Sequence, residues 1–174
     1  MNLKGCLKQQ YHAALAMLVD CVKKCPDSLW TVGEHPRTFW RIAFHTAFFT
    51  QLYLGQDEAA FKPWPVRHEK IHPGLWTSPA EVEPFELAKD EPSYNAEEML
   101  AYILYVDDLV DMLVDELNVD AQETGFSWYH NMDKLSHVLL NLRHLQGHVG
   151  QLSEILMQHG IDTDWVSASN KLDV

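Results

Sequence analysis

Residues 133–160 read DKLSHVLLNLRHLQGHVGQLSEILMQHG, and this stretch decides the fold class. Its apolar residues recur at spacings of three and four, the period of one face of an α-helix: Leu135, Val138, Leu142, Leu145, Val149, Leu152 and Leu156. We expect the helix to begin near Asn131 or Asp133 and to end at Gly160, since glycine commonly follows the last helical turn. The stretch predicts one long amphipathic helix with a single buried face.

Two segments in the first third of the chain carry the same helical period. The first covers roughly residues 3–24, and it ends before Pro26 because the residue preceding a proline avoids helical backbone angles. The second is expected to open at His35-Pro36, since proline is favoured at the first helical position, and to stop at Gly55.

The remaining helical segment begins at Asn95, whose side chain can cap the helix while Glu98 reaches back to the backbone. Its apolar positions run to Leu117, and four aspartates fall off that stripe and are expected to face water: Asp107, Asp108, Asp111 and Asp115. Four amphipathic helices without a strand pattern predict an all-α, four-helix bundle, with residues 1–174 as a single domain.

Residues 56–94 do not fit a minimal bundle, because they are rich in proline and carry Trp64 and Trp76. Such a long loop in a compact domain is usually functional or a linker. It provides a crossover between the second and third long helices, so these need not be antiparallel. We expect Trp64 or Trp76, together with Phe61, to pack against the helices, because aromatic burial offsets the entropy lost in ordering the loop.

The formal net charge of −12, from 13 basic and 25 acidic residues, argues against nucleic acid as a partner. No apolar run approaches the roughly 18–20 residues of a membrane span, and the N-terminal residues lack the apolar core of a secretory signal. We therefore expect a cytoplasmic protein without a membrane partner. Cys21 and Cys25 share one helical face and are expected to act as small buried or half-buried apolar residues.

Three of the ten histidines are the candidate metal ligands: His45, His144 and His148. His144 and His148 are four residues apart, so they lie on one helical face, at the border of the apolar stripe. His45 stands between Phe44 and the aromatic pair Phe48-Phe49, which must face the core. Three inward imidazoles would leave a coordination position open, as in catalytic rather than structural zinc sites.

Residues 141–152 read NLRHLQGHVGQL and are followed by Ile155-Leu156 and Gly160, and Phe44-His45 lies in the second long helix. This pattern resembles the DinB/YfiT-like family, whose last helix carries HxxxHxGQ before an apolar run and a glycine. The resemblance covers essentially the whole chain. It departs at Gly147 and Val149, where family members often carry histidine and arginine; neither is a ligand position.

The resemblance implies a DinB-like metal-dependent enzyme acting on a small molecule, in thiol S-transfer or thiol-dependent isomerisation. The metal would be divalent, with Zn or Ni favoured, although three imidazoles accept several metals. Gln151 is the candidate for orienting a ligand or water. Hydrolysis stays open, but it needs a carboxylate base near the metal, and the helix that carries His144 and His148 offers Gln146 rather than a glutamate. The alternative is a non-catalytic binding or stress-associated protein whose metal site is structural or empty.

A competing motif, His68-Glu69-Lys70-Ile71-His72, matches the HExxH pattern of zinc proteases. That mechanism needs a long helix, whereas this segment lies between Pro65 and Pro73 without apolar periodicity. A di-iron site is excluded because the paired helical Glu-x-x-His motifs are missing. His12 and His137 are expected at polar helix edges, with an outer or fourth contact to the metal as the alternative for either. His35, His130 and His159 lie near helix ends, where capping or interaction with the helix dipole accounts for them.

Apolar residues left over on the first and third long helices predict a two-fold homodimer, the commonest oligomer. The residues expected on that face are Tyr102, Leu104 and Tyr105.

Overall fold

The computed structural model describes residues 2–69, 71–75 and 92–172. These residues contain no β-strand, and their α-helices are α1 (Leu3–Lys24), α2 (Asp27–Trp30), α3 (Phe39–Leu54), α4 (Ala96–Glu116) and α5 (Lys134–Met157). A single-turn 3₁₀ helix, η1, covers Glu58–Ala60. The prediction of an all-α protein is confirmed.

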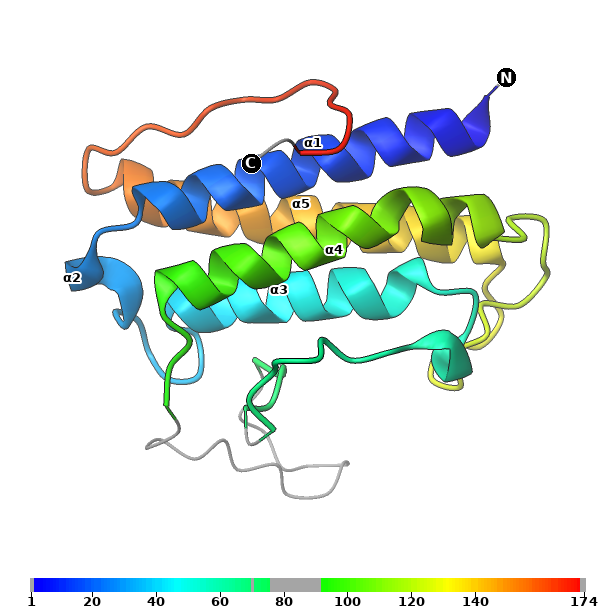
Figure 1. Cartoon of the computed structure of the whole chain (residues 1–174), viewed down its shortest axis with the longest axis horizontal. Helices are drawn as coiled ribbons and strands as arrows, with labels where there is room; N and C mark the ends of the chain where they lie inside the picture. The colour runs from blue at the N-terminus through cyan, green and yellow to red at the C-terminus, as the bar shows by residue number, and fades with distance from the viewer. Residues whose placement is uncertain (1, 70, 76–91, 173–174) are drawn as a thin grey trace.

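The four long helices pack side by side, with α3 and α1 each lying against both α4 and α5 (Figure 1). α3 and α4 run parallel: Tyr94, just before α4, contacts Trp40 at the start of α3, and Asn118, just after α4, bonds to Gln56 beyond the end of α3. A parallel pair requires a long connection, and the crossover through residues 56–94 provides it.

Local capping signals in the sequence are used as predicted. Asn95 and Glu98 form a reciprocal capping box at the start of α4, and Asp133 accepts a hydrogen bond from the Ser136 amide at the start of α5. Gly55 follows the last residue of α3. Gly160, two residues beyond the C-cap of α5, has a φ of 75°, a backbone conformation that glycine adopts without strain.

The start of α3 was predicted wrongly, because the helix begins at Phe39 rather than at Pro36. The Arg37 amide donates to the Glu34 carbonyl at 2.7 Å, and the Phe39 amide donates to the Val32 carbonyl at 3.2 Å. These two bonds fold residues 33–38 into a compact loop that contains Pro36. The short helix α2 was not predicted either, because a single turn is too short to show a period.

Lys134 joins the end of α3 to the start of α5. Its ammonium group is buried, and it donates hydrogen bonds to the carbonyls of Gly55 at 2.7 Å, Gln56 at 2.8 Å and Thr124 at 3.1 Å. Three acceptors match the three hydrogens of an ammonium group. α3 and α5 run antiparallel, so these three hydrogen bonds, the Lys134 clamp, fix the end of α3 against the start of α5. Arg37 lies at the other end of α3, just before its first turn.

The expectation that Asp107 faces water is wrong, because its side chain is only 1% exposed. One carboxylate oxygen lies 2.6 Å from Nδ1 of His12, which is also buried rather than at a polar edge. The other oxygen accepts a hydrogen bond from the Leu172 amide at 2.9 Å. The chain after α5 returns across α1 towards α4 and covers this pair (Figure 1), whereas Asp108, Asp111 and Asp115 stay exposed as expected.

Trp64 packs against the helices as predicted, stacked on Tyr102 with ring centroids 4.8 Å apart. Phe61 is half-buried against Phe48, and the expectation for Trp76 lies outside the described residues. Tyr102 is itself 1% exposed. It therefore cannot form part of the leftover apolar face expected for a homodimer, which stays a prediction for Leu104 and Tyr105.

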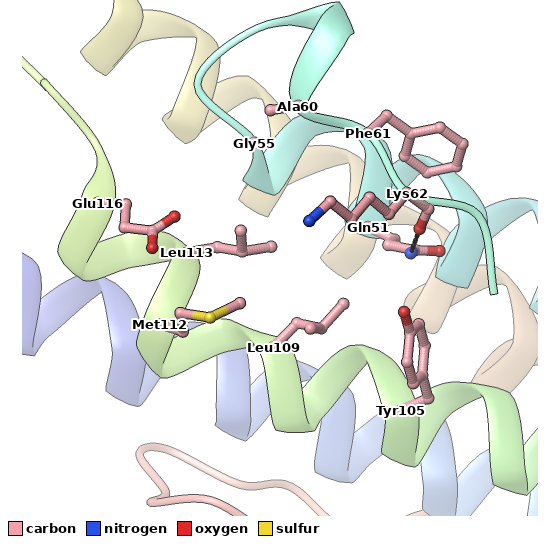
Figure 2. A pocket seen from close by; sticks show the side chains of 10 residues that line it. All are labelled: Gln51, Gly55, Ala60, Phe61, Lys62, Tyr105, Leu109, Met112, Leu113 and Glu116. Carbon is pink, nitrogen blue, oxygen red and sulfur yellow. Dashed lines mark hydrogen bonds between the residues drawn. The ribbon is translucent and has the colours of Figure 1, made fainter. Parts of the chain in front are cut away.

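Tyr105 lines a cavity of about 290 Å³ between α3, α4 and the segment that follows α3. Figure 2 shows Leu109, Met112 and Leu113 of α4 facing the Lys62 side chain across it. Cys21 is buried and Cys25 half-buried, as predicted. No helix among the described residues combines the length and the apolar character needed to cross a bilayer.

Candidate metal site

His45 is held in the middle of α3 by burial and by one main-chain hydrogen bond. Its side chain is 7% exposed, and its ring packs on Phe49 with centroids 4.6 Å apart. Nδ1 lies 2.7 Å from the carbonyl oxygen of Pro73. A carbonyl can only accept, so Nδ1 carries the proton and Nε2 presents a lone pair.

His148 has the same arrangement on α5. Its Nδ1 lies 2.8 Å from Oε1 of Gln151, one turn further along the helix. This assignment of the amide makes Nδ1 the donor and leaves Nε2 of His148 as an acceptor. Gln151 thus contacts a candidate metal-binding histidine, and its predicted role of orienting a ligand or water stays a prediction.

The three rings meet around His144. Its Nε2 lies 3.0 Å from Nε2 of His45 and 3.1 Å from Nε2 of His148. A proton on Nε2 of His144 could point to only one of these two acceptors, so at least one of the two short N···N approaches is made without a hydrogen bond. The three ligand atoms lie within 4.8 Å of one another, and two nitrogens bound to a tetrahedral zinc ion are roughly 3.3 Å apart.

Electrostatics keeps these imidazoles neutral, the state that binds a metal. Burial lowers the pKa of His45 to about 3, against the opposing effect of its bond to Pro73, and the charges of His148, His144 and Arg37 lower it further. Burial and the charge of His148 lower the pKa of His144 to about 4. Burial also lowers the pKa of His148, although the Gln151 bond opposes this.

The cluster is closed on one side and open on another. Phe49 contacts the rings of both His45 and His144, while His144 and His148 stay half-buried. A cavity of about 520 Å³ lies alongside, between α3 and α5, and Gln151 belongs to its lining. A metal ion held by the three histidines would fit both the donor chemistry and the spacing, with neutral nitrogens directed to one point.

Other histidines singled out in the sequence lie elsewhere. His68 Nε2 is 3.2 Å from a Glu98 carboxylate oxygen, and His72 Nδ1 accepts a hydrogen bond from the Gly74 amide. Neither residue is in a helix, as expected for a chance HExxH match. His137 is fully buried among Tyr53, Phe126 and Tyr129 rather than at an edge. Within the described residues, the metal-ligating side chains that gather in a group of three or more are His45, His144 and His148.

Two contributions to the site were missed by sequence reasoning. The Pro73 carbonyl fixes the His45 ring, but any residue offers a carbonyl, so no side-chain pattern could reveal it. Arg37, whose charge lowers the pKa of His45 and His148, precedes α3 in a loop that the sequence suggested was helical.

Fold and site together define an all-helical protein with a three-histidine cluster that could hold a metal ion. No family model, no curated protein and no solved structure matches the chain.

Proposed function

We propose that this chain is a DinB-like four-helix bundle whose His45, His144 and His148 hold one divalent metal ion, and that the site performs thiol chemistry on a small molecule. One observation carries the proposal: two imidazoles, each with Nδ1 committed to an acceptor, direct bare Nε2 atoms at the Nε2 of a third. A shared cation relieves the repulsion between these lone pairs, and outer partners of this kind are typical of metal-bound histidines.

A bound divalent ion would supply Lewis acidity, which lowers the pKa of a thiol or of water. The residues of the chain would orient the ligands, exclude water and admit the substrate. Pro73 and Gln151 orient two of the rings, Phe49 shields the buried side from water, and the cavity beside Gln151 admits a small molecule. S-transfer or thiol-dependent isomerisation is favoured over hydrolysis because Leu145, directly after His144, stands where the HExxH motif of zinc proteases has its glutamate base.

Glu154 is the carboxylate that lines the same cavity, and a hydrolase would need it as a base. Its side chain accepts a hydrogen bond from Gln158 at 3.0 Å, on an exposed part of α5. The Glu154→Gln variant separates the two chemistries: thiol transfer should persist in it, whereas hydrolysis of an ester or amide should be lost.

The test begins with metal content. Elemental analysis of the purified protein, after loading with Zn or Ni and desalting, should give one ion per chain, and the His45→Ala and His148→Ala variants should retain much less. A thiol-conjugation screen on the loaded protein then tests the chemistry. Equal metal in wild type and variants would refute the site. A stably bound metal with no activity towards any thiol would support the alternative, a structural site in a non-catalytic protein.

A further inference from the structure

The cavity beside the histidine cluster has one cationic and several apolar walls. It lies between the first turn of α3 and the second half of α5, and Gln151 connects it to the cluster because its amide oxygen also contacts His148. The residues that decide its chemistry are Arg37, Ile42, Leu75, Ile155 and Glu154. A pocket with apolar walls and few polar groups is typical of small-molecule sites.

Arg37 is held in place by the loop that precedes α3. Its amide donates to the Glu34 carbonyl at 2.7 Å, and its Nε donates to the Leu75 carbonyl at 3.4 Å. Gly33 packs directly on the Arg37 backbone: its φ is 132°, and an added Cβ would lie 2.4 Å from the Arg37 carbonyl oxygen. The loop therefore fixes the backbone of Arg37, and the exposed side chain of Arg37 lines the cavity.

Two residues of α5 that line the cavity are glycines and place no side chain in it. Gly147 and Gly150 lie within the helix and line the cavity, and an added Cβ at either would meet nothing within 4 Å. Each glycine in a helix interior costs about 1 kcal/mol relative to alanine, and no close contact of the backbone requires one here. Because neither glycine has a side chain, the cavity stays open beside Gln151, which contacts His148.

We propose that this cavity binds a small monocarboxylate with a short aliphatic chain, its carboxylate on Arg37 and its chain against Ile42, Leu75 and Ile155. The proposal names the substrate class of the proposed metal site and in that respect rests on the proposed function. The planar guanidinium fork matches a carboxylate. Glu154 on the same rim opposes a second negative charge, which favours a monoanion over a phosphate dianion.

The experiment uses chelator-treated protein, so that it reports on the cavity alone. Hexanoate and 1-hexanol are titrated into ¹⁵N-labelled wild type, Arg37→Gln and Gly147→Leu, with Arg67→Gln as a control at an exposed arginine outside the cavity lining. Hexanoate should shift the amide signals of Gly147, Gly150 and Gln151. Its affinity should fall about tenfold or more in Arg37→Gln, the loss expected for a charge-assisted hydrogen bond.

Gly147→Leu should also weaken hexanoate binding, because the leucine side chain fills the cavity while leucine favours the helix. Arg67→Gln should bind hexanoate as wild type does, and 1-hexanol should bind more weakly and equally to wild type and Arg37→Gln. Equal binding of acid and alcohol, or an unaffected Arg37→Gln, would overturn the proposal. A separate zinc titration of the wild type tests the proposed function. If the wild type binds hexanoate but not zinc, the metal site alone is refuted. If it binds zinc but not hexanoate, the carboxylate site alone is refuted.

Discussion

Replacing Gln151 by alanine removes a side chain that lies outside the cluster and is hydrogen-bonded to the candidate ligand His148. Its Oε1 lies 2.8 Å from Nδ1 of His148. Loss of such an outer partner costs about 10–100-fold in metal affinity, which is about 1.4–2.7 kcal/mol. Gln151 is exposed, so water can replace part of the bond. We therefore expect the lower end of the range, about a tenfold weaker affinity for zinc.

The assay is a competition titration of zinc against a chromogenic chelator at neutral pH, with circular dichroism to confirm unchanged helix content. Gln146→Ala is the matched control, because Gln146 lies on the same helix but points away from the face shared by His144 and His148. The His148→Ala variant shows how far the zinc affinity falls when a direct metal ligand is lost. The hypothesis fails if Gln151→Ala and Gln146→Ala bind zinc within twofold of each other while His148→Ala has lost it.

Three further predictions concern stability. Chelated wild type and His45→Ala should melt close to the metal-loaded protein in circular dichroism, because the apolar core dominates the burial energy; a steep drop in both samples would instead indicate a structural metal. Lys134→Met should lose about 3 kcal/mol in urea denaturation, because it leaves two buried carbonyls and one half-buried carbonyl without this donor, and a loss below about 1 kcal/mol would refute the clamp. Burial alone would lower the pKa of His12, but the hydrogen bonds and charges of Asp107 and, to a lesser extent, Asp111 outweigh it and raise the pKa above 6.5. The stability from this pair is therefore complete below pH 6.5 and falls as pH rises through the raised pKa. Asp107→Asn should remove that pH dependence, and an unchanged pH profile of urea midpoints would contradict it.

The features that the sequence predicted correctly depend on residues close together in the chain. The capping box of Asn95 and Glu98 and the Asp133 cap are local hydrogen-bond patterns. The contact between Gln151 and His148 was not predicted, although a spacing of three on one helix makes it possible.

The features that it missed depend on segments that meet only in the folded chain. Asp107 belongs to the polar face of α4 when that helix is considered alone, and the returning chain at Leu172 buries it. The Pro73 carbonyl at His45 comes from a loop without periodicity. Pro36 carries a strong signal for a helix start, but the hydrogen bond between Arg37 and Glu34 places it in a turn instead.

His45 and His144 meet across 99 positions of sequence. During synthesis, α3 leaves the ribosome with a single histidine of the set, and one imidazole holds a metal weakly. The complete donor set exists only after α5 has been made and has docked antiparallel on α3. Three imidazoles discriminate poorly between divalent metals, so the ion that the proposed site would first acquire depends on which metals are available where the last helix docks. The place and time of folding, rather than the ligands themselves, would then decide which metal the protein carries.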